Sequence, residues 1–398
     1  MYRILFSFFV VAALFASCGS DNSAPISETI DGVTYIHNKA PKYSSPQEAG
    51  FGLQFVGKTG DLYAADENYS LYLPVDIGLD KAGNLYVLDS GNYRVQVFDT
   101  QREYSRTFGR EGQGPGEFTL PTVLEFDEEE NIYISDRQNS RIDILATDGR
   151  SAGSLHIENA YRAFKLMKNG TFMIRGSSGG NAEEQDEVLT FPLIKVVTKD
   201  GTEVFTGGES VDFGDNATNY DANDIVFTAD DEGNIFTSFE YLNRIDIYNP
   251  EGILQKVIDR PLNYSTEIQK TTIERGEGYV SISSGDNNDV TNGIAVDSSG
   301  RIWALTFDRQ ILEGEKVSMS MTISNDGGKS TLSREISGNT ETVETDMYKL
   351  EVFDPEGMLL VEIPLTHFCD RMRIIGNKLF IIDNRRAHAV YEYDIIES

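Results

Sequence analysis

Aspartate and arginine recur at a fixed spacing within this chain. The phrase Asp-x-x-Asn-x-Arg occurs at Asp89–Arg94 and again at Asp136–Arg141, each time at the end of a run of strand-forming residues. A guanidinium group can bind a carboxylate through two parallel hydrogen bonds, so each pair could brace the turn in which it lies. The same guanidinium groups could instead bind an anionic or hydroxyl-rich ligand. The spacing leaves both interpretations open.

Two later segments keep half of this phrase. Arg244 is retained where Phe239 takes the place of the aspartate, and Asp383 is retained where His388 takes the place of the arginine. A complete ring of equivalent pairs is therefore not expected. If these residues bind a ligand, the candidates are Arg94, Arg141, Arg244, Asp89, Asp136 and Asp383.

Sequence motifs of common catalytic centres are absent. The four histidines have no metal-ligand spacing, and there is no H-E-x-x-H helix motif, G-x-S-x-G elbow or P-loop. The segment Asp286–Asp289 could bind calcium through its oxygen atoms, although such clusters of Asp and Asn also form ordinary turns. We therefore predict no catalytic residue and no cofactor, and calcium at Asp286 and Asp289 stays open as a weaker hypothesis.

The elements that carry these residues repeat six times. Each copy contains short strand-forming runs separated by a tight turn of Asp, Gly or Asn. One equivalent position is aromatic in every copy, namely Tyr86, Tyr133, Phe172, Phe236, Trp303 and Phe380. Repeats of roughly 40 residues with four strands each are typical of propeller blades. The sequence thus predicts an all-β fold, a six-bladed β-propeller of four-stranded antiparallel blades.

The repeats also resemble known families. The Asp-x-x-Asn-x-Arg phrase resembles NHL-repeat propellers, and the segment Phe108–Phe118 resembles the six-bladed propeller lipoproteins that are common in Bacteroidetes. Some six-bladed propellers, the gluconolactonase-like group and the peptide-amidating lyases, are enzymes with a metal-centred channel site. This chain resembles their architecture and not their ligand pattern. The resemblance therefore implies a metal-dependent hydrolase or lyase only as an alternative, with Asp89, Asp136 and Asp383 facing the channel.

The two ends of the predicted ring are complementary. Leu53–Val56 predicts a strand with no other strands of its own unit before it, whereas the last unit, Arg371–Ile396, contains only three strands. Pairing these segments removes two exposed sheet edges. We therefore expect the N-terminal strand to complete the C-terminal blade. A further hairpin candidate, Gly32–His37, is expected at the outer rim.

Long insertions fall on one side of the predicted ring, which we call the loop-rich face. It receives Gly57–Tyr72, Gly109–Thr119, Arg175–Thr190, Gly207–Asn223, Asp259–Thr291 and Phe307–Met347. The opposite side, the short-turn face, receives only tight turns such as Asp80–Gly83 and Asp127–Glu130. Insertions in repeat proteins collect on the binding face, so the loop-rich face is the predicted binding surface.

Two of these insertions predict structure of their own. Within residues 307–347, strict alternation over Val317–Ser324 precedes an Asn-Asp-Gly-Gly turn, which predicts a hairpin. Residues Thr266–Arg275 are predicted to hold a short helix.

The first residues predict export. Arg3 precedes the apolar run Ile4–Phe15, which is too short to span a membrane and fits the hydrophobic region of a secretory signal. Leu14–Cys18 looks like a bacterial lipobox, which implies a lipid on Cys18. We predict a lipoprotein signal peptide over residues 1–17, a flexible tether over 18–29 and the propeller over 30–398. The implied location is the cell envelope, anchored by lipid to a bacterial membrane, for which we expect the outer membrane, with either a periplasmic or a surface-facing orientation.

The net charge excludes one class of binding partner, and the cysteine count excludes an internal disulfide. The chain has 34 basic and 64 acidic residues and a net charge of −30, which repels nucleic acid and excludes it as a partner. Besides Cys18 the only cysteine is Cys369, so no internal disulfide is expected and Cys369 is predicted to be a buried, inert thiol.

These observations favour a non-catalytic binding propeller. Its loop-rich face would hold a glycan, a peptide or a protein, and its contact with the membrane would be through the lipid anchor alone. The alternative, a metal-dependent hydrolase or lyase, predicts that calcium stabilises the protein against heat.

Overall fold

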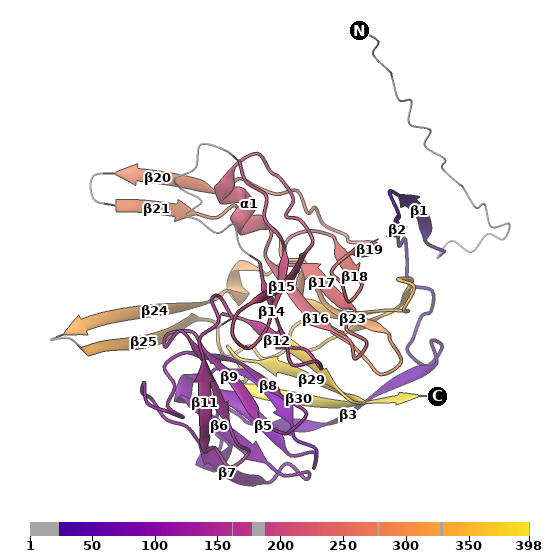
Figure 1. Ribbon diagram of the computed structural model, residues 1–398. Helices are drawn as coiled ribbons and strands as arrows, with labels where there is room; N and C mark the ends of the chain where they lie inside the picture. The colour runs from indigo at the N-terminus through magenta and orange to yellow at the C-terminus, as the bar shows by residue number, and fades with distance from the viewer. Residues whose placement is uncertain (1–23, 161, 177–187, 277–278, 327–328, 398) are drawn as a thin grey trace, which may run out of the picture.

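Six antiparallel blades surround a central channel (Figure 1). The computed structural model describes residues 24–160, 162–176, 188–276, 279–326 and 329–397. The predicted signal peptide and Cys18 lie outside the described residues.

In the first three blades the strands follow chain order from the channel to the rim. The first blade contains β4 (Pro74–Leu79), β5 (Leu85–Asp89), β6 (Arg94–Phe98) and β7 (Tyr104–Phe108). The second contains β8 (Pro121–Phe126), β9 (Ile132–Asp136), β10 (Arg141–Leu145) and β11 (Ser151–Leu155). The third contains β12 (Phe164–Leu166), β13 (Phe172–Arg175), β14 (Ile194–Val197) and β15 (Glu203–Gly207).

The remaining blades carry additions to this plan. The fourth contains β16 (Ile225–Ala229), β17 (Ile235–Phe239), β18 (Ile245–Tyr248) and β19 (Leu254–Asp259). The fifth contains β22 (Thr291–Val296), β23 (Ile302–Phe307), β26 (Tyr348–Phe353) and β27 (Leu359–Pro364). The sixth contains β28 (Arg371–Ile375), β29 (Lys378–Asp383), β30 (Ala389–Glu397) and β3 (Phe51–Thr59).

Contacts between neighbouring inner strands show that the ring is closed. Contacts run from β4 through β8, β12, β16, β22 and β28 back to β4. The predicted six-bladed propeller is therefore confirmed. All six repeated aromatic side chains are buried, which explains why this position stays aromatic while the rest of each repeat varies.

The N-terminal strand closes the ring as predicted. β3 pairs with β30 in antiparallel register, with Phe51 opposite Glu397 and Thr59 opposite Val390. Phe51 is fully buried and its ring lies 5.3 Å from that of Trp303 in the fifth blade. The strand is thus held by side-chain packing as well as by the β-ladder.

The chain before β3 covers two further sheet edges. β1 (Ile26–Ile30) and β2 (Val33–His37) form a hairpin, and β2 pairs in parallel with β19 at the rim of the fourth blade. The backbone N–H groups of Lys42 and Tyr43 then donate to β27 of the fifth blade. We call residues 26–59 the N-terminal belt, because it covers the outer edges of the fourth, fifth and sixth blades in turn.

The insertions of the loop-rich face form three compact elements. α1 (Asn216–Ala222) precedes the fourth blade, the hairpin β20 (Thr272–Gly276) and β21 (Tyr279–Ser283) follows it, and the hairpin β24 (Val317–Asp326) and β25 (Lys329–Gly338) lies within the fifth. Both hairpins project beyond the blades on the same side (Figure 1).

The helix predicted at Thr266–Arg275 is wrong. The β-branched run Thr271–Ile273 favours extended backbone, and β20 pairs with β21 at this place.

Cys369 is buried, as predicted, and burial raises the pKa of its thiol. Among the described residues no helix has the length and hydrophobicity needed to cross a membrane.

Candidate functional site

Asp89 and Arg94 brace a turn, as the structural interpretation predicted. Asp89 Oδ1 accepts from the backbone N–H of Tyr72 at 2.7 Å, and its Oδ2 accepts from Asn92 Nδ2 and Arg94 Nε, both at 2.8 Å. Arg94 Nη2 donates to the carbonyl of Ser70 at 2.6 Å. Because Asp89 is fully buried, these contacts account for a carboxylate that water does not reach.

The second copy uses a different carboxylate. Arg141 Nε donates to Asp143 at 2.9 Å, whereas Asp136 accepts from the backbone N–H groups of Thr119 and Leu120. The expected pairing of the aspartate with the arginine five residues on is therefore wrong for this copy. Arg141 also donates to three backbone carbonyls within residues 113–117, so it fastens the preceding link to its own blade.

Arg244 follows the same arrangement as Arg141. Its Nε and Nη2 donate to the two oxygens of Asp246 at 2.7 and 2.9 Å. Burial raises the pKa of Asp246, and the guanidinium of Arg244 opposes that rise. A signal for this pairing was present in the sequence: Arg-Ile-Asp-Ile occurs at 141–144 and 244–247, whereas the first copy has Gln96 at the acidic position.

Asp383 caps a turn without an arginine partner. Its carboxylate accepts from the backbone N–H groups of Arg385, Arg386 and Ala387, and burial raises its pKa to about 6. His388, in the arginine position, accepts from the backbone N–H of Leu73 through Nδ1, and burial lowers its pKa to about 4. Five of the six candidates thus hold turns or the link before their blade, whereas Arg244 contacts Asp246 on its own strand. None of the six lines the pocket at the channel or the groove between the third and fourth blades.

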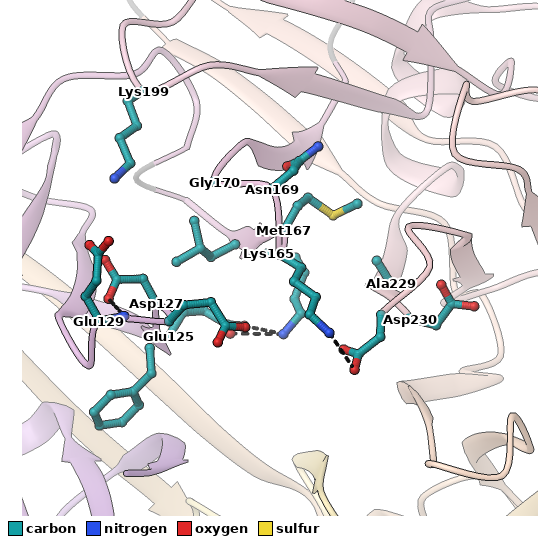
Figure 2. A pocket seen from close by; sticks show the side chains of 15 residues that line it. Glu125, Asp127, Glu129, Lys165, Met167, Asn169, Gly170, Lys199, Ala229 and Asp230 are labelled. Carbon is teal, nitrogen blue, oxygen red and sulfur yellow. Dashed lines mark hydrogen bonds and ion pairs between the residues drawn. The ribbon is translucent and has the colours of Figure 1, made fainter. Parts of the chain in front are cut away.

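A pocket of about 370 Å³ opens at the short-turn end of the channel (Figure 2). The first turns of the second, third and fourth blades line it, at residues 125–129, 165–170 and 229–231. Lys199 Nζ donates to the hydroxyl of Tyr133 at 2.9 Å, and Lys168 contacts Asp231 at 3.1 Å. The turns here are short, so their lengths did not predict a pocket on this face.

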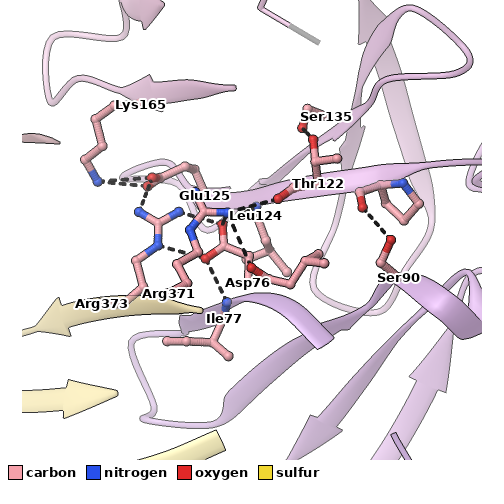
Figure 3. A network of polar contacts seen from close by, with 12 residues as sticks. Asp76, Ile77, Ser90, Thr122, Leu124, Glu125, Ser135, Lys165, Arg371 and Arg373 are labelled. Carbon is pink, nitrogen blue, oxygen red and sulfur yellow. Dashed lines mark hydrogen bonds and ion pairs between the residues drawn. The ribbon is translucent and has the colours of Figure 1, made fainter. Parts of the chain in front are cut away.

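Glu125 and Lys165 in the wall of this pocket belong to a charged network between inner strands (Figure 3). Arg373 of β28 binds both oxygens of Asp76 in β4, at 2.8 and 2.6 Å, and donates to Glu125 of β8 at 2.7 Å. Lys165 of β12 contacts Glu125 at 2.9 Å. Arg371 donates to backbone carbonyls of the first and second blades. The network therefore joins four consecutive blades.

The arginines control the protonation of the buried carboxylates. Burial by itself would raise the pKa of Asp76, but Arg371 and Arg373 outweigh it and hold that pKa below its usual value. For Glu125, Lys165 and Arg373 outweigh burial in the same way. Both carboxylates are therefore charged and ion-paired at neutral pH.

A second mixed-charge cluster lies on the loop-rich face where the third, fourth and fifth blades adjoin. Arg175 forms an ion pair with Asp224, and its guanidinium lies 5.5 Å from the centre of the Tyr220 ring. The backbone carbonyl of Glu240 accepts from the N–H of Val290, which brings Glu240 beside Asp289. Burial raises the pKa of Glu240 to about 6.

The two calcium candidates differ in their surroundings. Asp286 is exposed, whereas Asp289 is partly buried on the loop-rich face, where burial raises its pKa. Within the part of the chain that the structure describes, no group of three or more His, Cys, Asp or Glu side chains is arranged to hold a metal ion.

Comparison with known proteins supports the architecture. Residues 77–145 match a family model described as a six-bladed β-propeller. No curated protein sequence matches the chain.

Solved protein structures share the fold of this chain at low sequence identity. A member of the DUF4221 family from Bacteroides vulgatus has a TM-score of 0.52 and 9% identity, over 88% of this chain and 99% of that one. A candidate exported protein from Bacteroides fragilis has a TM-score of 0.50 and 11% identity, over 92% of this chain and 100% of that one. A gluconolactonase from Xanthomonas campestris, with 12% identity over 88% and 93% of the two chains, has a TM-score of only 0.45 and carries no argument about catalysis.

The closed ring of inner strands, the family model and the Bacteroides structures agree, and the chain is a six-bladed β-propeller.

Proposed function

We propose that this protein is a non-catalytic binding propeller of the bacterial cell envelope, which holds a glycan, a peptide or a protein on its loop-rich face. The observation that carries the proposal is that α1 and both inserted hairpins lie on that face, while the opposite face has only short turns. Loops that stand on a rigid scaffold are the usual place of binding surfaces.

The base of the first hairpin is fixed in place. The two oxygens of Asp221 in α1 accept hydrogen bonds from Thr271 Oγ1 at 2.9 Å and from Ser284 Oγ at 3.0 Å. These two residues immediately flank β20 and β21, so one carboxylate holds both ends of the hairpin. A surface that is ordered before binding loses less entropy when it binds.

The base of the second hairpin is tied to the propeller. Arg386 of the sixth blade donates to the carbonyls of Thr342 and Glu315 on either side of β24 and β25. Arg309 donates to both oxygens of Glu315, at 2.7 and 2.6 Å, which lowers the pKa of Glu315 to about 2. Both hairpins are thus presented by fixed bases.

Removing the hairpins tests the proposal. The soluble fragment from Asn22 onwards would be compared with a variant in which residues 272–283 and 317–338 are each replaced by a Gly-Ser-Gly linker. In the part of the chain that the structure describes, β20–β21 and β24–β25 are separate two-stranded sheets that join no blade, so the melting temperature should be unchanged. Binding to the glycans and peptides that the parent retains on arrays should fall at least tenfold. A fragment starting at residue 39, which lacks the rim hairpin β1 and β2, is the matched control, and equal binding by all three proteins would refute the proposal.

Lipid attachment at Cys18 is the second part of the proposal. It rests on the signal-like N-terminus, and the similarity to an exported candidate from Bacteroides fragilis is consistent with export. Cys18→Ser should move the full-length protein from the membrane fraction to the soluble fraction after cell lysis. Unchanged membrane association of this variant would refute the lipid anchor and leave the binding proposal untouched.

No specific observation favours the hydrolase or lyase alternative. The channel carboxylates Asp76 and Glu125 are both bound by arginine or lysine side chains, so they already have cationic partners. Because these carboxylates are already paired, they leave few free ligands for a metal in this part of the channel.

A further inference from the structure

Neighbouring blades are fastened to one another at their short-turn ends. In five of the six seams a basic side chain bridges the two blades: Arg102 to Glu392, Arg106 to the carbonyl of Thr147, Lys199 to the hydroxyl of Tyr133, Lys256 to Glu356, and Arg301 to Glu397. Each of these contacts links one pair of neighbouring blades at this end.

The seam between the third and fourth blades differs from the other five seams in its polar contacts. Its outer turn, residues 249–253 of the fourth blade, bonds within itself through Asn249. Among the described residues, no hydrogen bond or ion pair joins this turn to the third blade. Within the described part of the chain, the ion pair that joins the two blades at this end is Lys168 with Asp231, whose side chains are 54% and 83% exposed; the other contacts here are packing of the turn at Gly252 against Phe205. Such an exposed pair contributes little to stability.

An apolar groove of about 660 Å³ opens where the bridge is missing. Its apolar lining includes Met167, Val196, Val204, Phe205 and Pro250. Phe205 and Val196 belong to the core between these two blades, so the groove is the open end of that core. Val204 is 53% exposed, so the groove presents apolar side-chain surface to solvent.

The rim of the groove is acidic. Asp230, Asp231, Glu232 and Glu251 line it, against Lys168 as the one cation in the lining. Asp230 accepts from the backbone N–H and the side chain of Asn234, and Asp231 contacts Lys168. Glu232 and Glu251 are exposed, and both stand on the turns that border the groove. The rim therefore offers carboxylates to a cation above an apolar floor.

We propose that this groove binds a peptide segment in which basic side chains alternate with apolar ones. The apolar side chains would cover Val204, Phe205 and Pro250, and an ammonium or guanidinium group would lie between Glu232 and Glu251. The volume is within the usual range for ligand sites, about 300–1,000 Å³. Charge complementarity selects a basic partner, because an acidic peptide would meet four carboxylates.

The groove also borders the channel pocket. Both are lined by Met167, Lys168, Asn169, Asp230 and Asp231, so the exposed contact between Lys168 and Asp231 separates the two spaces. A basic ligand side chain competes with Lys168 for Asp231. Because the groove lies on the short-turn face, its occupation is independent of the loop-rich face.

Fluorescence anisotropy with a labelled octapeptide of alternating leucine and lysine tests the proposal. The soluble fragment should bind this peptide, and the Glu232→Gln and Glu251→Gln double variant should bind at least tenfold more weakly. Val204→Ser should weaken binding at least threefold. All three positions are exposed, so melting temperatures should stay within a few degrees of the parent.

Controls separate the groove from the negative charge of the whole protein. Glu67→Gln with Glu341→Gln removes two exposed carboxylates from the loop-rich side and should leave binding within twofold. An alternating leucine and glutamate peptide should not bind. Equal losses in both double variants, binding of the acidic peptide, or full competition by spermine without any effect of Val204→Ser would each overturn the proposal.

Discussion

The arginines of the repeats differ in the carboxylate that each one contacts, and one position explains the difference. Where the residue two places after the arginine is aspartate, as at Asp143 and Asp246, the arginine binds that aspartate on its own strand. Where that residue is Gln96, the arginine binds Asp89 at the end of the neighbouring strand. Each arginine therefore binds a buried carboxylate within its own blade.

Removal of Arg244 should destabilise the fold. Arg244→Ala leaves Asp246 buried without its cation, and losing one partner of a buried pair costs about 3 kcal/mol. We expect the free energy of unfolding, measured by urea denaturation, to fall by about this amount. Arg137→Ala is the control, since Arg137 is exposed, and it should change stability by less than about 0.5 kcal/mol. A loss of ligand binding by Arg244→Ala with unchanged stability would contradict the structural role.

At the scale of elements, the N-terminal belt determines which blade edges are covered. β2, residues 42–43 and β3 cover the fourth, fifth and sixth blades, whereas β7, β11 and β15 end the first three sheets. An unpaired edge strand can pair with another chain. The belt thus protects half of the ring with one continuous segment.

Two truncations should distinguish the contributions of β1 and β2 to stability from the contribution of β3. A fragment that starts at residue 39 loses β1 and β2, whose side chains are mostly exposed or partly exposed, and it should remain folded with a melting temperature a few degrees lower. A fragment that starts at residue 60 also loses β3 and the fully buried Phe51, which leaves β30 unpaired. We expect this second fragment to aggregate or to lose cooperative melting, as judged by size-exclusion chromatography and circular dichroism. Similar melting of both fragments would show that β3 is dispensable.

The sequence predicts the elements better than the site. The turn phrases and the repeated aromatic positions are local signals, so the blades and the role of β3 could be read directly. Asp76, Glu125 and Lys165 are each the single charged residue of an inner strand, and Arg373 shares β28 with Arg371. They meet only because the ring closes, and no local pattern shows that they will pair. The groove arises from a missing bridge, which a list of residues does not reveal.

At the scale of the whole molecule, the channel network is a second closure of the ring. Arg373 joins the last inner strand to the first through Asp76 and to the second through Glu125. This contact is independent of the β-ladder between β3 and β30, because it lies at the opposite edge of the sixth blade. The sixth blade is thus fixed at both its rim and its inner strand.

The channel network should determine how the free energy of unfolding changes at acidic pH. The folded-state pKa values of Asp76 and Glu125 are lowered, so their contribution is present above the unfolded values near 3.8 and 4.5 and is lost as pH falls through the lowered values. Arg373→Met removes the cation that contacts both carboxylates, so both pKa values should rise, and the free energy of unfolding at neutral pH should fall by about 3–5 kcal/mol. Acid titration followed by tryptophan fluorescence should show a higher midpoint than in the parent. Arg150→Met, which breaks an exposed ion pair with Asp148, should not move the midpoint.

Calcium should have little effect on the intact fold. Because Asp286 is exposed and Asp289 stands apart from any described group of metal ligands, we expect the melting temperature to change by less than a degree or so with calcium and then with chelator. A rise of several degrees that chelator reverses would contradict this prediction and favour the hydrolase or lyase alternative.

The pairing of β3 with β30 has a consequence for how the protein is made. β3 ends at Thr59 and β30 begins at Ala389, so nearly the whole chain is synthesised between the two strands. At about 5–20 residues per second, roughly 330 residues take from a quarter of a minute to a minute. During that interval β3 has no partner strand. The sixth blade, and with it the closed ring, can therefore form only after β30 has been translated.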